Sequence, residues 1–359
     1  MARPTTAQID LSAIRQNYQL AKSLAPNSQA LAVIKADAYG HGAVKVAQGL
    51  EAEADGFAVA AIEEAIELRE AGIRKPILLL EGFFDANELP LISEHALSCV
   101  VHTNSQIEAL AAYNGVGTFD IWVKIDIGMH RLGLPPSQTK TALSRLGALK
   151  CVRNITLMGH FSCADDLAAS TTIEQRRLFE RLAGNTQFAT SLSNSAAILG
   201  WPTVNSDWIR PGLMLYGASP YEAPQEDADR LLPAMTLKSE VIAVRTISAG
   251  ESVGYGASWT ADRPTRIGTV AIGYADGYPR QIRSGAPVVV GGMRTKLVGR
   301  VSMDMITVDL TDIPAANIGT PVELFGRQLL AGELAPWANT IPYTLFTGIT
   351  RRVHKVYSD

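Results

Sequence analysis

Short apolar runs recur along the first two thirds of the chain, and most of them precede a segment with apolar residues at helical spacing. Buried parallel strands are predicted at eight runs: 31–36, 56–60, 76–82, 97–103, 119–127, 154–161, 188–194 and 206–210. Helices are predicted at 11–26, 61–72, 104–113, 137–149 and 170–184. Eight strands that alternate with helices favour an α/β fold, a (β/α)8 TIM barrel.

A doubly wound open sheet is the alternative fold for the same alternation. Such a sheet commonly carries a glycine-rich GxGxxG phosphate-binding turn after its first strand. Here the first predicted strand leads to Lys35 instead. The pattern therefore favours the barrel over the open sheet.

Beyond residue 230 the pattern changes to short β-branched runs divided by glycine and proline, with little helical periodicity. This texture predicts a mainly β second domain. The polar, proline-containing stretch 221–233 is the expected boundary. We therefore expect a barrel over 11–230 and a mainly β domain over 231–359, with the first ten residues available to pair with the second domain.

Composition narrows the range of partners. Among 359 residues, 47% are hydrophobic, and the net charge is only −3 without a run of like charges. These features argue against a nucleic-acid or membrane partner and favour a small-molecule substrate. The opening MARPTTAQID has no apolar signal segment, so a cytoplasmic protein is expected. Cys99, Cys151 and Cys163 lack metal-ligand or disulfide spacing, so we expect reduced thiols and no metal site.

Several polar residues follow predicted strands at their carboxyl ends, where the active sites of TIM barrels lie. They are Lys35, Tyr39, Arg131, His160, Asn194, Ser195 and Arg210. Taken singly, His160 can be a satisfied core histidine and Arg210 a structural arginine. Their shared position at strand ends is what favours one common site.

Lys35 follows the apolar residues Val33 and Ile34 at the predicted barrel mouth. The ordinary interpretation is a lysine that extends its ammonium group into water. Partial desolvation at a barrel mouth would instead lower the pKa of the amine and make it a nucleophile suited to imine formation. A Schiff-base lysine is therefore a candidate role.

Two segments offer backbone N–H groups for a phosphate-bearing cofactor. Ser195 begins SAAIL after the seventh predicted strand, and RPGLMLYG presents Gly212 and Leu213 after the eighth. Barrels commonly bind phosphate at this place, although ordinary turns would use the same residues.

Two further residues stand out by their surroundings. Lys124 lies within the fifth predicted strand, so its buried ammonium needs an ion pair, for instance with Asp126, or a role in orienting Arg131. Tyr255 stands between two glycines in the β domain, a setting that favours an aromatic ring at a turn. Packing is the ordinary interpretation of such a tyrosine.

Taken together, the motifs of this chain closely resemble those of bacterial alanine racemases, fold-type III enzymes that depend on pyridoxal 5′-phosphate (PLP). The matching segments follow the family order over essentially the whole chain: AVIKADAYGHG, VKIDIGMHRLG, GHF, SNSAA, WIRPGLMLYG, VGYGASW, GYADGYPR and GRVSMDM. The resemblance implies interconversion of L-alanine and D-alanine in a head-to-tail homodimer, with each site completed by the partner subunit.

The resemblance also implies how the cofactor is held. Lys35 would carry PLP as an imine, Arg210 would donate to the pyridine nitrogen, and Arg131 would lie near the phenol oxygen. The phosphate would be bound by Tyr39, Ser195, Gly212 and Leu213, with Asn194 alongside. Because an arginine does not give its proton to the ring, electron withdrawal is weaker than with an aspartate, which suits rapid reprotonation over side reactions.

Racemisation needs two bases, one on each face of the external aldimine. By resemblance, Lys35 would serve the D-enantiomer and the partner's Tyr255 the L-enantiomer. A tyrosine with a pKa near 10 is a weak base, so neighbouring cations must favour its ionised form, and His160 linked to Arg210 is the candidate helper. Arg131 and Met303 would bind the substrate carboxylate.

The family often carries a carbamylated lysine where Lys124 stands, which would explain its burial. One departure concerns the C-terminus, where some relatives place a phosphate-binding tyrosine and TGITRRV offers Thr350, Arg351 and Arg352. Three other functions remain: a PLP-dependent decarboxylase, a PLP-carrying regulatory protein and a broad-spectrum racemase. The sequence leaves open a biosynthetic or catabolic role, and activity on serine.

Overall fold

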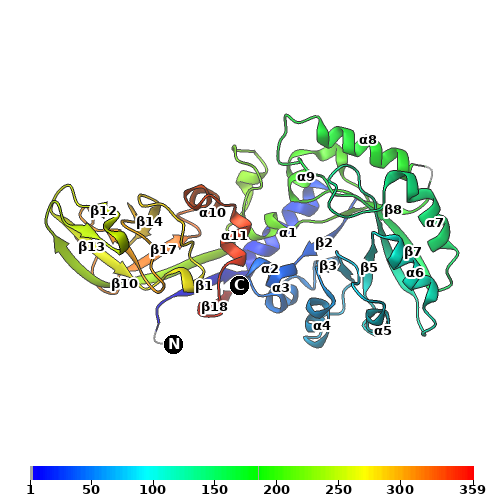
Figure 1. The fold of residues 1–359 in the computed structure, drawn as a ribbon, viewed down its shortest axis with the longest axis horizontal. Coiled ribbons are helices and arrows are strands. Elements are labelled where there is room, and N and C mark those ends of the chain that lie inside the picture. Colours follow the sequence, from blue (N-terminus) through cyan, green and yellow to red (C-terminus); the bar gives the residue numbers. More distant parts are fainter. Residues whose placement is uncertain (1–2, 185) are drawn as a thin grey trace.

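The computed structural model describes residues 3–184 and 186–359, and it divides into a barrel and a β domain (Figure 1). Eight parallel strands close the barrel in sequence order. They are β2 (Gln29–Val33), β3 (Gly56–Val59), β4 (Ile77–Leu79), β5 (Ser98–Val101), β6 (Phe119–Lys124), β7 (Val152–Met158), β8 (Ala189–Ser191) and β9 (Trp208–Ile209). Each overlaps one predicted run. The TIM barrel is therefore confirmed, and the open sheet is excluded by the pairing of β2 with β9.

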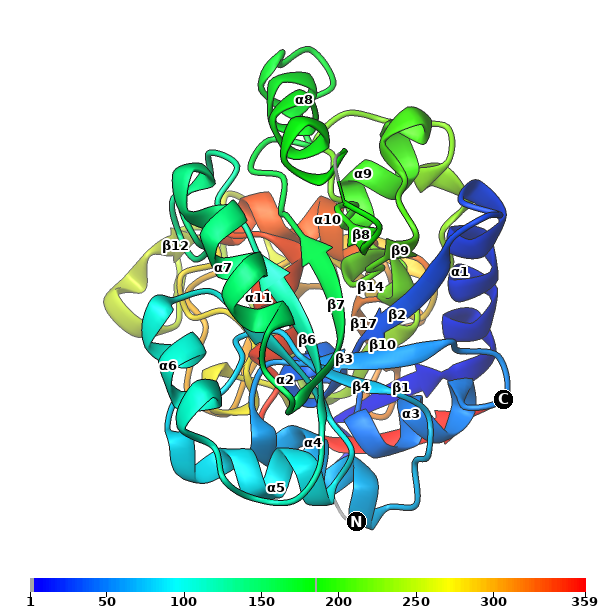
Figure 2. The same cartoon turned by 90° about the vertical axis from the view of Figure 1, so that its right-hand side faces the viewer.

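Helices cover the outside of the barrel (Figure 2). The principal ones are α1 (Leu11–Leu24), α3 (Ala43–Leu50), α4 (Ile62–Glu70), α5 (Leu89–Glu94), α6 (Asn104–Ala112), α7 (Thr139–Gly147), α8 (Thr171–Ala183) and α9 (Ser195–Gly200). Their starts follow capping chemistry. Asp10 accepts a hydrogen bond from the Ala13 N–H at 3.0 Å, and the Thr103 side chain caps α6 through the Gln106 N–H.

The second domain is built on one large sheet around the long strand β10 (Met235–Ile247). The other strands are β13 (Thr265–Val270), β14 (Pro287–Val290), β15 (Met293–Lys296), β16 (Ile306–Asp309) and β17 (Pro321–Phe325), with a separate pair of β11 (Ser252–Val253) and β12 (Trp259–Thr260). The mainly β character predicted beyond residue 230 is confirmed.

Both ends of the chain join this sheet. Strand β1 (Thr6–Asp10) pairs antiparallel with β10 and parallel with β18 (His354–Ser358). Between the sheet and the barrel lie the short helices α10 (Ala331–Leu334) and α11 (Pro342–Thr347) (Figure 1). Helix α11 packs against α2 (Lys35–Tyr39), so the C-terminal part of the chain reaches the barrel mouth.

In the described part of the chain, no helix combines the length and hydropathy needed to cross a bilayer. The three cysteines are free thiols, and Cys99 is buried. Within the same described ranges, no group of three or more histidine, cysteine, aspartate or glutamate side chains is arranged to hold a metal ion.

Candidate active site

A cavity of about 570 Å³ opens at the carboxyl ends of the barrel strands, the end at which barrel enzymes carry their active sites. Ten residues singled out from the sequence line it: Lys35, Tyr39, Lys124, Arg131, His160, Asn194, Ser195, Arg210, Gly212 and Leu213. They come from the ends of five strands, β2, β6, β7, β8 and β9, and the segments that follow them. Tyr255 and Met303 do not line this cavity.

The backbone turns sharply between Lys35 and Tyr39. Strand β2 ends at Val33, so the predicted strand reaching residue 36 is too long. Four successive non-glycine residues, 36 to 39, have φ between 52° and 54°, a left-handed turn that costs roughly 1–2 kcal/mol per residue. The turn brings both Lys35 and Tyr39 to the cavity. Strain of this kind at a ligand site is a common sign of function.

Two carboxylates hold the left-handed turn in place. The Ala36 N–H donates to Glu64 Oε1 at 2.6 Å, and the Ala43 N–H donates to Asp37 Oδ1 at 2.7 Å. The other oxygen of Asp37 forms an ion pair with Lys355 of β18. The β domain therefore helps to fix the position of the lysine.

A small cradle lies where Ser195, Gly212 and Tyr39 meet. Ser195 Oγ accepts hydrogen bonds from the N–H groups of Gly212 at 2.9 Å and Met214 at 3.3 Å. A Cβ atom at Gly212 would stand 2.9 Å from Tyr39 Oη, so only glycine leaves the cradle open. Among the described residues, no acceptor occupies the Leu213 N–H. Hydroxyl, phenol and N–H groups in this arrangement fit a phosphate.

Asn194 serves the adjacent helix directly. Its side chain is the N-cap of α9 and accepts a hydrogen bond from the Ala197 N–H at 3.0 Å. The same side chain lines the cavity, so its structural role positions Ser195, the first residue of the helix.

The close packing of the cradle predicts that one added methyl group, at Gly212, strongly weakens cofactor binding. Gly212→Ala should weaken retention of PLP roughly ten- to hundredfold, because overpacking beside a fixed ring costs about 1–3 kcal/mol. The cofactor retained after dialysis, followed by its absorbance, is the measurement. Gly332→Ala is the matched control, since a Cβ there meets no atom within 4 Å. Equal retention in the two variants would contradict the assignment of the cradle.

Tyr39 is held by two further tyrosines. Its ring stacks on Tyr216 with centroids 4.8 Å apart and lies 5.7 Å from the ring of Tyr343 on α11. Tyr343 also lines the cavity, and burial raises the pKa of its phenol to about 12. Sequence reasoning missed this residue because it looked for a C-terminal tyrosine close to Arg352. The proline-started segment IPYTLF was the available signal.

Arg210 occupies the floor of the cavity and is nearly fully buried. Its guanidinium donates to Ser191 Oγ at 2.5 Å and to the Gly159 carbonyl at 2.8 Å. A third contact joins it to His160 Nδ1 at 3.3 Å. Burial lowers the pKa of Arg210 to about 10, and burial together with the Arg210 charge holds the pKa of His160 well below its usual value. His160 is therefore neutral and accepts through Nδ1.

Lys124 is buried, at 6% exposure, without an ion pair among the described residues. The expected pair with Asp126 is absent, because Asp126 instead binds His130 Nδ1 at 2.8 Å. Burial, together with the charges of Arg210, Arg131 and Lys35, lowers the pKa of Lys124 to about 8, and Glu81 opposes this shift. Glu81 also lines the cavity and was not singled out from the sequence, which offered no signal for it beyond its place after β4.

Tyr255 and Met303 lie on the β domain and face outward, with exposed fractions of 73% and 53%. Tyr255 begins a short turn just before β12. Strand β12 lies in the part of the β domain away from the barrel (Figure 1). The single chain therefore does not bring Tyr255 to Lys35.

Two segments of the β domain, GYADGYPR and GRVSMDM, lie against each other. The Tyr274 N–H donates to the Ser302 carbonyl, and the Ala275 N–H donates to the Met303 carbonyl, each at 3.0 Å. Near them, a hollow of about 700 Å³ is lined partly by exposed apolar side chains, among them Ile242, Tyr255 and Met305. Exposed apolar surface of this kind is typical of a protein interface.

Comparisons with known proteins agree with this geometry. Residues 9–220 match the family model "Alanine racemase, N-terminal domain", and residues 234–357 match "Alanine racemase, C-terminal domain". An alanine racemase of Pseudomonas taetrolens and a catabolic alanine racemase of Pseudomonas putida are each 57% identical over 97% of this chain and 98% of their own.

Solved structures show the same likeness. The biosynthetic alanine racemase of Pseudomonas aeruginosa has a TM-score of 0.97 at 48% identity, covering 99% of this chain and 100% of its own. The alanine racemase of Bartonella henselae, solved with covalently bound pyridoxal phosphate, has a TM-score of 0.91 at 30% identity and covers both chains fully. The chain described here belongs to the alanine racemase family of PLP-dependent isomerases.

Proposed function

We propose that this chain racemises alanine by a two-base mechanism in which Lys35 acts on one face of the substrate and Tyr255 of a second subunit acts on the other. One observation carries the proposal. Ten predicted residues, Lys35 among them, line one cavity, while Tyr255 of the β domain is exposed to solvent and does not line that cavity. A second copy of the chain is needed to bring the two groups together.

The cavity fits PLP by the chemistry of its donors. The cradle of Tyr39, Ser195 and Gly212, together with the Leu213 N–H, would hold the phosphate, and Lys35 would bind the aldehyde. When bound, PLP would supply the electron withdrawal that weakens the bond between Cα and hydrogen in the amino acid. Arg210 would face the pyridine nitrogen as a hydrogen-bond donor.

Arg210 is well placed to keep that nitrogen unprotonated. Its guanidinium is held by Ser191, Gly159 and His160, so it presents a fixed donor rather than a transferable proton. With the ring nitrogen unprotonated, the cofactor would withdraw electrons more weakly, so a proton donor on the opposite face of the substrate would be required close by. Lys35 Nζ and Tyr255 Oη are the two groups that would remove and return the proton.

Substrate orientation would come from both subunits. Arg131 lines the cavity and is exposed in the single chain, so its guanidinium is free to take the carboxylate of alanine. By the resemblance to alanine racemases, Met303 of the second subunit would lie beside it, and in the single chain this side chain is exposed and available for such a contact. A homodimer with shared sites follows from this arrangement.

Lys124 is proposed to be carbamylated. Only the neutral amine attacks carbon dioxide, and a pKa of about 8 leaves a substantial neutral fraction near neutral pH. The product is an anion, which would relieve the crowding of Lys124 by Arg210, Arg131 and Lys35 and would brace Arg131 by a charge-assisted pair.

Carbamylation predicts a carbamate signal in the ¹³C spectrum of protein equilibrated with labelled bicarbonate. Lys124→Gln should remove the signal and raise the KM for alanine roughly tenfold, because one charge-assisted contact to Arg131 is lost. Lys150→Gln, an exposed lysine away from the cavity, is the control. A native spectrum without the signal would exclude the modification.

The proposed reaction is tested with purified, PLP-loaded protein and L-alanine, L-serine or D-alanine in deuterium oxide. We expect loss of optical rotation with alanine and deuterium at Cα of the product enantiomer, because a solvent-exchanged group on the opposite face returns the proton. Release of carbon dioxide would instead indicate a decarboxylase. Unchanged rotation of alanine would refute the proposal, and the serine arm defines the substrate range.

D-alanine made in this way would serve peptidoglycan synthesis in the cytoplasm or, in the reverse direction, the breakdown of D-alanine. Both a biosynthetic and a catabolic enzyme are similar to this chain. Complementation of a strain that requires D-alanine tests the first role, and growth on D-alanine as the carbon source tests the second.

A further inference from the structure

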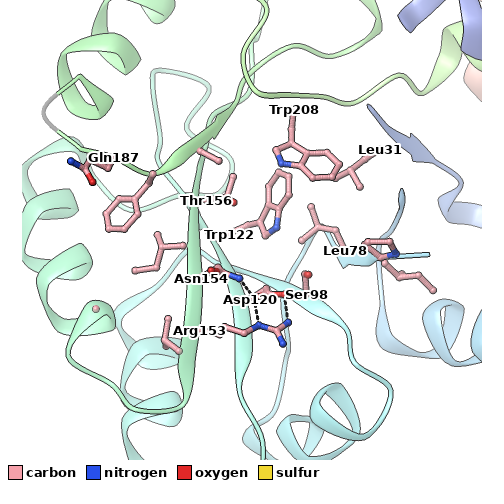
Figure 3. A pocket seen from close by; sticks show the side chains of 17 residues that line it. Leu31, Leu78, Ser98, Asp120, Trp122, Arg153, Asn154, Thr156, Gln187 and Trp208 are labelled. Atoms are coloured by element: carbon pink, nitrogen blue, oxygen red, sulfur yellow. Dashed lines mark hydrogen bonds and ion pairs between the residues drawn. The ribbon is translucent and has the colours of Figure 1, made fainter. Parts of the chain in front are cut away.

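A second cavity, of about 610 Å³, lies at the opposite end of the barrel from the candidate active site (Figure 3). It is lined by residues at the amino ends of the strands, including Ser98, Asp120, Asn154 and Ala189. The interior of a TIM barrel is normally filled by layers of bulky side chains. Here several of the residues at the amino ends of the strands are small or polar, and a cavity remains at this end of the barrel.

Two tryptophans, Trp122 and Trp208, line this cavity and do not line the candidate active site. Trp122 of β6 and Trp208 of β9 meet edge to face, with ring centroids 5.7 Å apart and an angle of 64° between the planes. Figure 3 shows the two rings side by side, with Asp120 and Arg153 across the cavity from them. Since side chains alternate along a strand, Trp122 shares the inward face of β6 with Lys124, which lines the catalytic cavity.

The polar groups of the cavity neutralise one another. Arg153 Nε donates to Asp120 Oδ1 at 2.9 Å and its NH2 group donates to Oδ2 at 2.5 Å, while Asn154 Nδ2 donates to Oδ1 at 2.8 Å. The hydrogen bond from Arg153 also lowers the pKa of Asp120, so the carboxylate stays ionised and paired. No unpaired charge is therefore presented to a ligand by this group.

The indole groups supply the remaining recognition. Among the residues that the structure describes, neither the Trp122 nor the Trp208 indole N–H donates a hydrogen bond. Indole N–H groups are donors only, so a ligand here should offer an acceptor. The cavity volume lies within the range of about 300–1,000 Å³ that is usual for small-molecule sites. The aromatic faces, with apolar Leu31 and Leu78 nearby, favour a flat ligand.

We infer that the amino end of the barrel is a second small-molecule site, which takes an uncharged planar aromatic molecule with a hydrogen-bond acceptor. The site is separate from the catalytic cavity, because no residue lines both. Quinoline, which is uncharged at neutral pH and has one ring-nitrogen acceptor, is a suitable probe.

The test uses full-length, PLP-loaded protein labelled with ¹⁵N at its five tryptophans, assigned by single Trp→Phe variants. Quinoline is expected to shift the indole N–H signals of Trp122 and Trp208, with a Kd of about 1 mM for a ligand of this size. The signals of Trp201, Trp259 and Trp337 should stay in place. Saturating alanine should leave the shifts intact, because the two cavities are distinct.

Two controls make the inference falsifiable. Ser98→Leu fills the cavity, and the Ser98 side chain makes no hydrogen bond among the described residues, so the change should weaken quinoline binding at least about tenfold without removing another contact of this kind. Ser137→Leu makes the same change on the exposed surface and should bind normally. The N-methylquinolinium cation, which has the same shape but no acceptor, should bind weakly. Absence of shifts, displacement by alanine, or equal binding by Ser98→Leu would overturn the inference.

Discussion

Replacing Lys35 by alanine is expected to lower alanine racemisation at least about 10³-fold, because the change removes both the attachment point of PLP and one of the two bases. Lys35 is half-buried at the start of a left-handed turn whose backbone is held by Glu64 and Asp37. The turn therefore survives the substitution, and the loss reports on the amine itself. Initial rates in both directions, measured by optical rotation, are the readout.

Lys45→Ala is the matched control for this change. Lys45 lies on α3 only ten positions further along the chain, and its side chain is exposed. Lys45→Ala should retain full activity. Borohydride reduction followed by peptide mass analysis should label Lys35 in the native protein and no lysine in Lys35→Ala. Near-native activity of Lys35→Ala would show that another group carries the reaction.

Mixing two inactive variants is expected to restore activity. If each site joins Lys35 of one subunit to Tyr255 of the other, a heterodimer of Lys35→Ala and Tyr255→Phe has one site with both native groups. Random pairing yields heterodimers in half of the dimers, so about a quarter of the native activity should return. Each variant alone should have at most about a thousandth of the native rate in the direction that uses the base it lacks, D to L for Lys35→Ala and L to D for Tyr255→Phe.

The two variants must be allowed to exchange subunits, which co-expression with different affinity tags ensures. Tyr221→Phe is the matched control, because that tyrosine hydrogen-bonds the Ala196 carbonyl and does not line the catalytic cavity. Tyr221→Phe should therefore be active by itself. Purified heterodimer as inactive as its parents would place both bases within one chain or remove Tyr255 from the reaction.

The barrel could be predicted because its signals are local. Most of the eight strands lie in runs rich in apolar residues, and several α helices carry caps and periodic apolar positions of their own. The carboxyl ends of parallel strands all meet at one end of a closed barrel, so residues as distant as Lys35 and Arg210 could be assigned to one cavity from the strand pattern. The resemblance to alanine racemases added their roles.

Other features depend on contacts between distant segments. The left-handed turn at 36–39 is unfavourable for alanine, aspartate and tyrosine, so no local preference predicts it. The turn is held by residues far along the chain: Glu64 accepts the Ala36 N–H, and Lys355 pairs with the Asp37 carboxylate. Tyr343 reaches the cavity for a similar reason, since α11 packs on α2.

The sequence by itself determined the fold class, the β character of the second domain and most of the side chains at the barrel mouth, because these follow from hydrophobic period and strand direction. Only the tertiary structure decided that Asp126 binds His130 rather than Lys124, that Tyr255 points away from its own barrel, and that a cavity remains beneath Trp122 and Trp208. Each of these depends on which side chains meet in the folded chain, and the hydrophobic period along the sequence does not record such meetings.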